Sequence, residues 1–244
     1  MATQVFKIFR YNPSADKRPY YQSYEIEVKP SWTVFDCLNK IRSGHDSTLT
    51  YRRSCRGGIC GSCAMNINRK NLLACETMVA TLGKKVITLR PLPHFEVIRD
   101  LVVDMTCFFR AIERIRPFAH ADKRAEQEII QSPAERKKLD GLYECILCGA
   151  CTSACPSFWY NDQYPGPAAL LKAFRFVADS RDQASDERLP AVDTGDGVWQ
   201  CHTIFNCVEA CPKGLNPTNA IQQLKRRIFS HTWRCSKKKA HEYT

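Results

Sequence analysis

Fourteen of the 244 residues are cysteines, and their spacing constrains the fold more than any other feature of this sequence. They form two sets separated by residues 84–142, which contain no metal-binding spacing. The first eleven residues alternate apolar and charged side chains, without the continuous apolar run of an export signal. We therefore expect a reducing compartment, where clustered cysteines bind metal more often than they form disulfides.

The first set has the spacing Cys55-x4-Cys60-x2-Cys63, followed by Cys75. This spacing is typical of plant-type [2Fe–2S] ferredoxins. Glycines within the loop allow the backbone to wrap closely around a small cluster, and nearby N–H groups can hydrogen-bond its sulfurs. The alternative is a four-cysteine zinc site, but such sites usually combine two short C-x2–4-C pairs. The spacing therefore favours a [2Fe–2S] cluster.

The second set contains Cys145-x2-Cys148-x2-Cys151-x3-Cys155-Pro156, the spacing of bacterial two-cluster ferredoxins. In such proteins the first three cysteines hold one cluster and the fourth ligates the other, so a complementary run is expected. It is present in altered form, as Cys201-x2-Ile204-x2-Cys207-x3-Cys211-Pro212. The residues expected to hold a [4Fe–4S] cluster are Cys145, Cys148, Cys151 and Cys211.

Ile204 stands where the second cysteine of the altered run would be, and isoleucine cannot ligate iron. The other cluster then has only Cys155, Cys201 and Cys207, which predicts a [3Fe–4S] centre with a vacant corner. The alternative is a [4Fe–4S] centre with water or an outside ligand on its fourth iron. Three cysteines remain: Cys37 and Cys107 are interpreted as core residues of helices, and Cys235 is given no role.

The fold class predicted from local patterns is α+β. Strands are expected at Val5–Tyr11 and Tyr21–Val28, then a helix capped by Thr33, a hairpin across Met65–Leu73 and a strand at Val86–Leu89. Past Asp100 the pattern becomes helical. The first helix is expected to start at Asp104 or Thr106 and to bury Phe108, Phe109, Ile112 and Ile115, and further helix starts are expected at Ser132-Pro133, Pro167 and Asn216-Pro217. We therefore expect two domains, residues 1–104 and 105–244.

The net charge is +11, and basic residues are concentrated in two segments of the chain. Arg52, Arg53 and Arg56 lie beside the first cysteine loop, and the segment from Lys225 to the C-terminus carries seven basic residues against one acidic residue, Glu242. That tail is either a solvated extension or a contact for anionic lipid or an acidic partner. Aromatic and basic residues are not interleaved as in nucleic-acid binding proteins. No apolar stretch is long enough to cross a bilayer, and no dinucleotide fingerprint is present.

Several motifs resemble the iron–sulfur subunit of succinate dehydrogenase, respiratory complex II, over nearly the whole chain. The motifs are Arg53-Ser54-Cys55-Arg56, Cys60-Gly61-Ser62-Cys63-Ala64-Met65-Asn66, Arg99-Asp100-Leu101-Val102-Val103-Asp104-Met105, Glu144-Cys145-Ile146-Leu147-Cys148, Cys155-Pro156-Ser157-Phe158-Trp159, Gly166-Pro167-Ala168-Ala169 and Cys201-His202-Thr203-Ile204-Phe205-Asn206-Cys207. The resemblance implies an N-terminal plant-type ferredoxin β-grasp domain followed by an all-α bacterial-type ferredoxin domain.

The resemblance also implies a function in the tricarboxylic acid cycle and the respiratory chain. An FAD-containing flavoprotein partner would oxidise succinate, and electrons would pass through the [2Fe–2S], [4Fe–4S] and [3Fe–4S] clusters to a membrane quinone such as ubiquinone. Membrane anchor subunits, which in this family can carry haem b, would complete the complex. By position, the quinone-site residues implied are Pro156, Tyr160, His202 and Ile204; most relatives have tryptophan at the place of Tyr160. The expected location is peripheral, on the matrix side of the mitochondrial inner membrane or the cytoplasmic face of a bacterial plasma membrane.

Three other interpretations remain. The iron–sulfur subunit of a quinol:fumarate reductase would run the reaction in reverse, although Cys201-His202-Thr203-Ile204 favours succinate oxidation. A free polyferredoxin carrier would be acidic and monomeric, whereas this chain is basic. A zinc-stabilised scaffold would contain zinc and no iron.

Overall fold

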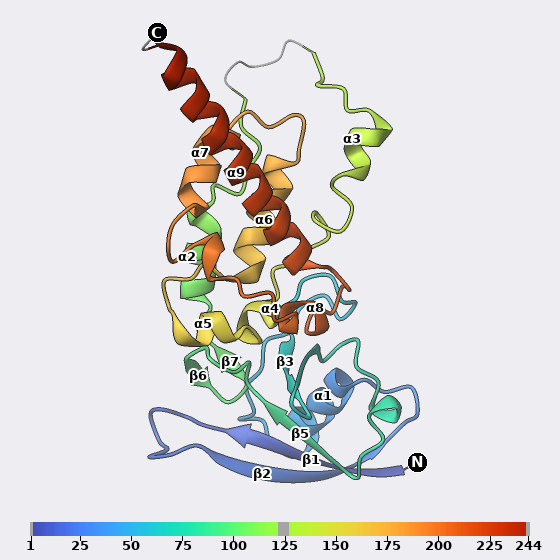
Figure 1. Ribbon diagram of the computed structural model, residues 1–244. Coiled ribbons are helices and arrows are strands. Elements are labelled where there is room, and N and C mark those ends of the chain that lie inside the picture. The colour runs from blue at the N-terminus through green and yellow to red at the C-terminus, as the bar shows by residue number, and fades with distance from the viewer. Residues whose placement is uncertain (1, 122–126, 243–244) are drawn as a thin grey trace. The chain divides into compact units, whose positions relative to one another are not determined.

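The computed structural model describes residues 2–121 and 127–242, without the side chains of residues 232–242. Cys235 and the basic side chains from Arg234 to Lys239 therefore lie outside the described residues. The chain forms two compact units (Figure 1). The first comprises Met1–Thr106, Ile146–Ala154 and Ala210–Pro212, and the second comprises Cys107–Cys145, Cys155–Glu209 and Lys213–Thr244. The division into domains at residues 1–104 and 105–244 stays a prediction.

The first unit is built on a five-stranded mixed sheet with the strand order β2-β1-β5-β3-β4. β1 and β5 run parallel, and the other neighbours are antiparallel. A small second sheet pairs β6 with β7. The strands are β1 (Ala2–Arg10), β2 (Tyr20–Val28), β3 (Ala64–Ile67), β4 (Lys70–Leu73), β5 (Val86–Arg90), β6 (Val97–Arg99) and β7 (Val102–Val103). The helical segments of this unit are α1 (Val34–Gly44), the 3-10 turn η1 (Val79–Leu82) and α4 (Ala150–Ser153).

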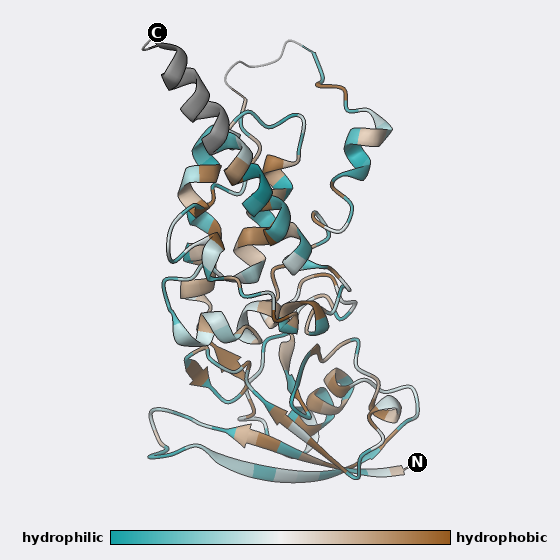
Figure 2. Ribbon diagram, viewed as in Figure 1, coloured by the Kyte–Doolittle hydropathy of each residue, from teal (hydrophilic) through white to brown (hydrophobic). Residues whose placement is uncertain are grey.

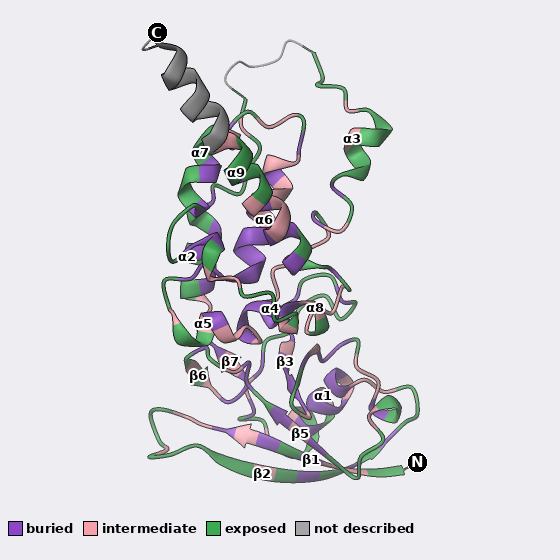
Figure 3. Cartoon of the chain, viewed as in Figure 1, coloured by how far each residue is buried: buried purple, intermediate pink, exposed green. Residues whose placement is uncertain are grey.

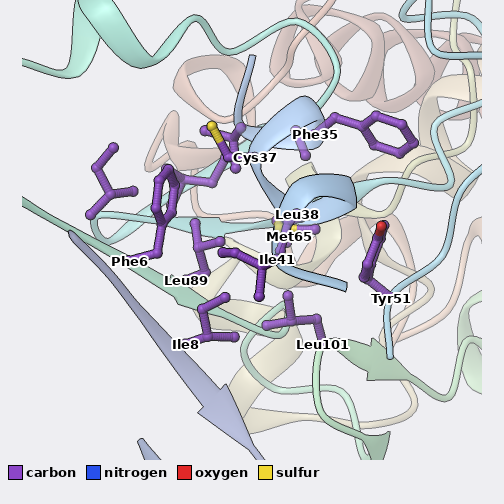
Figure 4. Packing of buried hydrophobic residues seen from close by; sticks show 14 of the residues in the cluster. Phe6, Ile8, Phe35, Cys37, Leu38, Ile41, Tyr51, Met65, Leu89 and Leu101 are labelled. Carbon is purple, nitrogen blue, oxygen red and sulfur yellow. The ribbon is translucent and has the colours of Figure 1, made fainter. Parts of the chain in front are cut away.

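Helix α1 packs on the sheet and closes the core of the first unit (Figure 4). Its N-terminus is a capping box, in which the hydroxyl of Thr33 accepts from the backbone N–H of Asp36 and the Asp36 carboxylate accepts from the N–H of Thr33. Leu38 and Ile41 recur at helical spacing and are completely buried against Phe6 and Ile8 of β1 and other core residues. The capped helix and the alternating strands therefore bury one shared apolar face.

The β3–β4 hairpin turns through Asn68 and Arg69, which both have positive φ, of 49° and 73°. A two-residue turn of this kind has the twist that suits an antiparallel hairpin. The hairpin expected across Met65–Leu73 is thus present with a tight turn of two residues.

A buried charged network joins β1 to two loops of the first unit. The Arg10 guanidinium donates to Asp100 Oδ1 at 3.0 Å, to Tyr24 Oη at 2.6 Å and to Thr48 Oγ1 at 2.8 Å, and it forms an ion pair with Asp46. Asp100 also accepts from the backbone N–H of Tyr11 and of Thr50. The side chains of Arg10 and Asp100 are only 6% and 2% exposed, so each carries its charge inside the fold.

Within its described residues, the regular secondary structure of the second unit consists of helices, joined by loops. Its elements are α2 (Thr106–Arg114), which begins at the unit boundary, α3 (Pro133–Lys137), α5 (Pro156–Tyr160), α6 (Gly166–Val177), α7 (Ser185–Val192), the 3-10 turn η2 (Val198–Gln200), α8 (Asn206–Glu209) and α9 (Pro217–Glu242). Helix α6 is mostly apolar (Figure 2) and mostly buried (Figure 3), and it packs against α9. Leu170 and Phe176 of α6 share a core with Ile221 and Leu224 of α9.

Arg188 of α7 is the largest buried side chain of this core, at 1% exposure. Its guanidinium lies over the Phe176 ring, pairs with Asp182 and donates to the carbonyl of Phe118 at 2.6 Å. A buried arginine is tolerated here because its donors meet acceptors.

Two expectations about helix α2 are wrong. Phe109 is 45% exposed and Cys107 is exposed, although both were expected in the core, whereas Phe108, Ile112 and Ile115 are buried. Consecutive positions of a helix are about 100° apart around its axis, and the side of α2 that faces the core carries Phe108, Ala111 and Ile112 and leaves Phe109 outside it. Cys37, in contrast, is completely buried in the first unit.

The predicted fold class is confirmed: a mixed-sheet unit of the β-grasp type, followed by a helical unit, gives an α+β chain. In the part of the chain that the structure describes, none of the helices combines the length and apolar character needed to cross a membrane.

Candidate iron–sulfur cluster sites

The loop between α1 and β3 brings backbone donors to the first cysteine set. The N–H groups of Gly57, Ile59 and Cys60 point at Cys55 Sγ at 3.3–3.4 Å, and the N–H of Gly58 points at Cys75 Sγ at 3.3 Å. Such donors stabilise thiolate sulfurs that carry negative charge. The backbone donors of the loop therefore favour negatively charged thiolates, the ligands of a [2Fe–2S] cluster, over neutral thiols.

Two glycines make this loop possible. Gly58 has a φ of 68°, and a Cβ there would lie 2.0 Å from the Glu76 carboxylate. Gly61 has a φ of 70°, and a Cβ there would lie 2.8 Å from the Cβ of Cys148. Any larger residue would strain the backbone and displace these neighbours.

The four thiols of this set interact with one another. Cys60 is hydrogen-bonded to Cys55, and Cys63 is hydrogen-bonded to Cys75 and lies in the field of Cys60. Burial raises the pKa of Cys63 to about 12, so a cation must hold it as a thiolate, as bound iron would. Within the described residues no three histidine, cysteine or carboxylate side chains are grouped to hold one single metal ion.

Ser62 is a functional residue that the sequence interpretation missed. Its hydroxyl lies 3.1 Å from Cys60 Sγ, and this bond is the main cause that lowers the pKa of Cys60 to about 6. A thiolate can only accept, so the hydroxyl donates. The motif Cys60-Gly61-Ser62-Cys63 places a hydroxyl between two ligands, which is the one signal in the sequence that could have indicated it.

We expect Ser62→Ala to lower the reduction potential of the [2Fe–2S] centre. The hydrogen bond stabilises the more negative reduced state, and a difference of about 1 kcal/mol corresponds to roughly 40 mV for one electron. A redox titration followed by electron paramagnetic resonance (EPR) of the full chain measures the shift. Ser62→Thr keeps the hydroxyl and is the matched control; equal potentials in Ser62→Ala and the original chain would contradict the role of this bond.

The residues expected to hold the [4Fe–4S] cluster are divided between the units. Cys148, Cys151 and Cys211 belong to the first unit, and Cys145 is the last residue of a stretch of the second. Cys151 is buried in α4, and the other three are partly buried. The Nδ2 group of Asn71 in β4 anchors this region by donating to the carbonyl of Ala150 at 3.1 Å.

Cys155, Cys201 and Cys207 line one common cavity within the second unit. Burial raises the pKa of Cys207, and the nearby Cys155 and Cys201 thiols add to that effect. Ile204 also lines the cavity and is 51% exposed. The three expected ligands and the residue that replaces the fourth are thus gathered in one place.

The loop that carries Ile204 is strained. Thr203 and Phe205, on either side of it, have φ angles of 60° and 69°, which bulky or β-branched residues rarely adopt. The Gln222 side chain of α9 donates to Thr203 Oγ1 at 3.0 Å and holds the loop. Backbone strain of this kind clusters at functional sites.

Helix α9 adds two contacts to these ligands that the sequence did not indicate. Thr218 Oγ1 lies 3.3 Å from Cys207 Sγ, and Lys225 Nζ donates to the carbonyl of Cys201 at 3.0 Å. Asn216-Pro217 predicted the helix start, but no pattern showed that its first turns would face these cysteines.

The proposed quinone residues are only partly brought together. Pro156, His202 and Ile204 line the same cavity as the three cysteines. Tyr160 is 94% exposed and does not line that cavity. Its neighbour Trp159 is also exposed, at 44%.

Comparison with known families agrees with these sites. Residues 5–110 match the family of 2Fe-2S iron-sulfur cluster binding domains, and residues 141–215 match the family of 4Fe-4S dicluster domains. The chain is therefore an iron–sulfur protein with a [2Fe–2S] domain followed by a dicluster domain. For the first cysteine set, this finding overturns the zinc alternative.

Solved structures share the fold. A chain of the Mycobacterium smegmatis Sdh1 complex in the apo form is 22% identical, with a TM-score of 0.84, over 95% of this chain and 97% of that chain. A hypothetical protein from Helicobacter pylori is 17% identical, with a TM-score of 0.57, over 91% of this chain but 39% of that chain. The resemblance found in the sequence is thus confirmed at the level of its two domains and their fold.

Proposed function

We propose that this chain is the electron-transfer iron–sulfur subunit of a succinate:quinone oxidoreductase. The observation that carries the proposal is the cavity shared by Cys155, Cys201, Cys207 and Ile204, because it joins a three-thiolate site to a protein that also has [2Fe–2S] and [4Fe–4S] domains. The structural neighbour from an Sdh1 complex supports the same assignment.

The clusters supply one-electron chemistry, and the chain supplies their ligands. Cys55, Cys60, Cys63 and Cys75 would hold the [2Fe–2S] cluster, and Cys145, Cys148, Cys151 and Cys211 the [4Fe–4S] cluster. Cys155, Cys201 and Cys207 would hold the [3Fe–4S] cluster. The three are ordered from an FAD-containing flavoprotein partner, which carries out succinate oxidation, to a membrane quinone.

The quinone site is proposed at Pro156, His202 and Ile204, with Tyr160 at its edge. His202 is exposed and lines the three-cysteine cavity, where its imidazole would contact the bound quinone. Tyr160 presents its phenol to the surroundings and can donate to a quinone oxygen once an anchor subunit covers it.

Partners follow from the same proposal. The exposed Trp159, Tyr160, Ile204 and Phe205 suit contact with membrane anchor subunits. The protein would then be peripheral, on the matrix side of the mitochondrial inner membrane or the cytoplasmic face of a bacterial plasma membrane.

Low-temperature EPR of the purified protein tests the proposal. We expect a signal from [3Fe–4S] in the oxidised protein and a signal from [2Fe–2S] after reduction. Absence of the oxidised-state signal in undamaged protein would refute the vacant corner at Ile204, and zinc without iron by elemental analysis would refute the clusters altogether.

The direction of the reaction needs a separate assay. The alternative is the iron–sulfur subunit of a quinol:fumarate reductase, for which the cysteine sites would be the same. Steady-state rates of the complex with ubiquinone and menaquinone analogues distinguish the two. Faster fumarate reduction with a low-potential quinol would favour that alternative.

A further inference from the structure

A groove of about 630 Å³ lies on the surface of the first unit, beside the first cysteine loop. Helix α1 forms one side, and the segment that leads into Cys55 forms the other. The groove is lined by Trp32, Asp36, Asn39, Lys40, Arg42, Ser43, Arg53 and Arg56.

Four of these residues are basic and only Asp36 is acidic. The Asp36 carboxylate is occupied by the α1 capping box, where it accepts from the N–H and hydroxyl of Thr33 at 2.9 and 2.7 Å. Within the described residues, no ion pair involves the four basic side chains of the groove, although ion pairs do form elsewhere in this unit. The groove therefore has an excess of positive charge that the fold itself does not neutralise.

The basic groups are gathered rather than scattered. Burial raises the pKa of Tyr51, and the nearby Arg53, Arg42 and Arg56 oppose that rise, which places three guanidinium groups around one phenol. Arg42 is held in place by its bond to the carbonyl of Leu49 at 2.8 Å. The Arg56 guanidinium lies 5.9 Å from the centre of the Phe35 ring. These contacts hold like charges together at a cost that a negatively charged partner would relieve.

The basic side chains of the groove lie next to the exposed loop that carries the first cysteine set. Arg53 and Arg56 flank Cys55, and Cys55 and Cys60 are exposed on the same loop, with Ile59 exposed at 70%. A small anion would bind best in an enclosed site with buried polar groups. Here Lys40, Arg53 and Arg56 are exposed, as charges are at the rim of a protein interface.

We propose that this groove receives an acidic segment of the protein that delivers electrons to the [2Fe–2S] cluster. The inference rests on the proposed function, because it takes the donor to be the flavoprotein subunit. Docking in the groove would bring the donor against the loop that exposes Cys55, Cys60 and Ile59. Arg53 and Lys40, on the two sides of the groove, would attract the segment and fix its direction.

The test uses charge reversal in the cluster-loaded full chain. Lys40→Glu with Arg53→Glu is expected to slow association with the flavoprotein subunit of the same organism by about 10- to 100-fold and to weaken its salt dependence. The matched control is Lys84→Glu with Lys85→Glu, which changes the charge by the same amount at two exposed positions of the same unit outside the groove lining. Association is followed by surface plasmon resonance at several salt concentrations, and EPR checks that each variant keeps its clusters.

The possible outcomes distinguish a failure of the groove proposal from a failure of the proposed function. Slower association in the groove variant alone supports the proposal, and so does a deca-glutamate peptide that competes with the flavoprotein for the original chain but not for that variant. Equal slowing in both variants, or none in the groove variant, would overturn it. If the original chain, with its clusters intact, binds no flavoprotein at all, the proposed function itself fails.

Discussion

Replacing Ile204 with cysteine is expected to remove the [3Fe–4S] signal of the oxidised protein and to add one iron per chain. Ile204 lines the cavity of Cys155, Cys201 and Cys207, so a thiolate at this position can complete a four-cysteine site. The side chain is half exposed, and its replacement empties no core. The change therefore acts on ligation and leaves the fold in place.

The conversion also predicts a loss of activity in the assembled complex. A [4Fe–4S] centre accepts electrons less readily than a [3Fe–4S] centre, and a decrease of roughly 60 mV already changes a one-electron equilibrium tenfold. We expect quinone reduction with succinate to fall at least about tenfold, while the [2Fe–2S] signal keeps its potential. EPR measures the cluster signals and the [2Fe–2S] potential, iron analysis measures the iron content, and steady-state assays measure the rate of quinone reduction.

Ile204→Val is the control, since valine occupies nearly the same space and cannot ligate iron. It should keep the oxidised-state signal and the iron content of the original chain. An Ile204→Cys variant that still shows the [3Fe–4S] signal at full intensity would mean that residue 204 does not face the open corner.

Local features of the fold could be predicted from the sequence because their causes are local. Thr33 caps α1 as expected, and Asp36, three residues later, completes a capping box with it. Pro167 and Pro217 lie in the first turns of α6 and α9, where a missing N–H costs nothing. The cysteine sets were recognised for a similar reason, since cluster ligation fixes the spacing along the chain.

Features that depend on distant contacts could not be predicted. Thr218 meets Cys207 only because α9 folds back onto α8, eleven residues earlier, and nothing in the sequence around Thr218 indicates a sulfur neighbour. The exposure of Cys107 and Phe109 depends on which side of α2 faces the core, and a short helix leaves that choice open. The groove cations come from α1 and from a loop, which the sequence alone does not place side by side.

The network around Arg10 is another such feature, and its removal is expected to have the largest effect on stability. Arg10 is 36 residues from Asp46 and 90 from Asp100, yet it binds both. Replacing it with methionine would leave two carboxylates of low exposure without their cation. Removing one partner of a buried ion pair costs about 3–5 kcal/mol, so we expect the first unit to lose that much free energy of unfolding in Arg10→Met.

Hydrogen exchange of the β1 and β2 amides in the full chain measures this loss in the first unit alone, because bulk unfolding of a two-unit chain is not a two-state process. Arg18→Met, at an exposed position between the same strands, should change the free energy of unfolding by no more than about 0.5 kcal/mol. The loss of unfolding free energy in Arg10→Lys should lie between the losses in Arg10→Met and Arg18→Met, because an ammonium group cannot reach all the acceptors of the planar guanidinium.

The pH dependence of the Arg10→Met effect provides a second check. Burial tends to raise the pKa of Asp46, but hydrogen bonds from Thr48, Tyr24 and Arg10 outweigh it and hold that pKa well below its usual range. A carboxyl with a lowered pKa in the folded state contributes stability that is complete above about pH 4 and is lost as the pH falls further. Without Arg10 the pKa of Asp46 should rise, so the stability gap between the two proteins should narrow from pH 7 towards pH 3.5. A gap below about 1 kcal/mol at pH 7, or one that does not change with pH, would mean that the ion pairs of Arg10 contribute little to the fold.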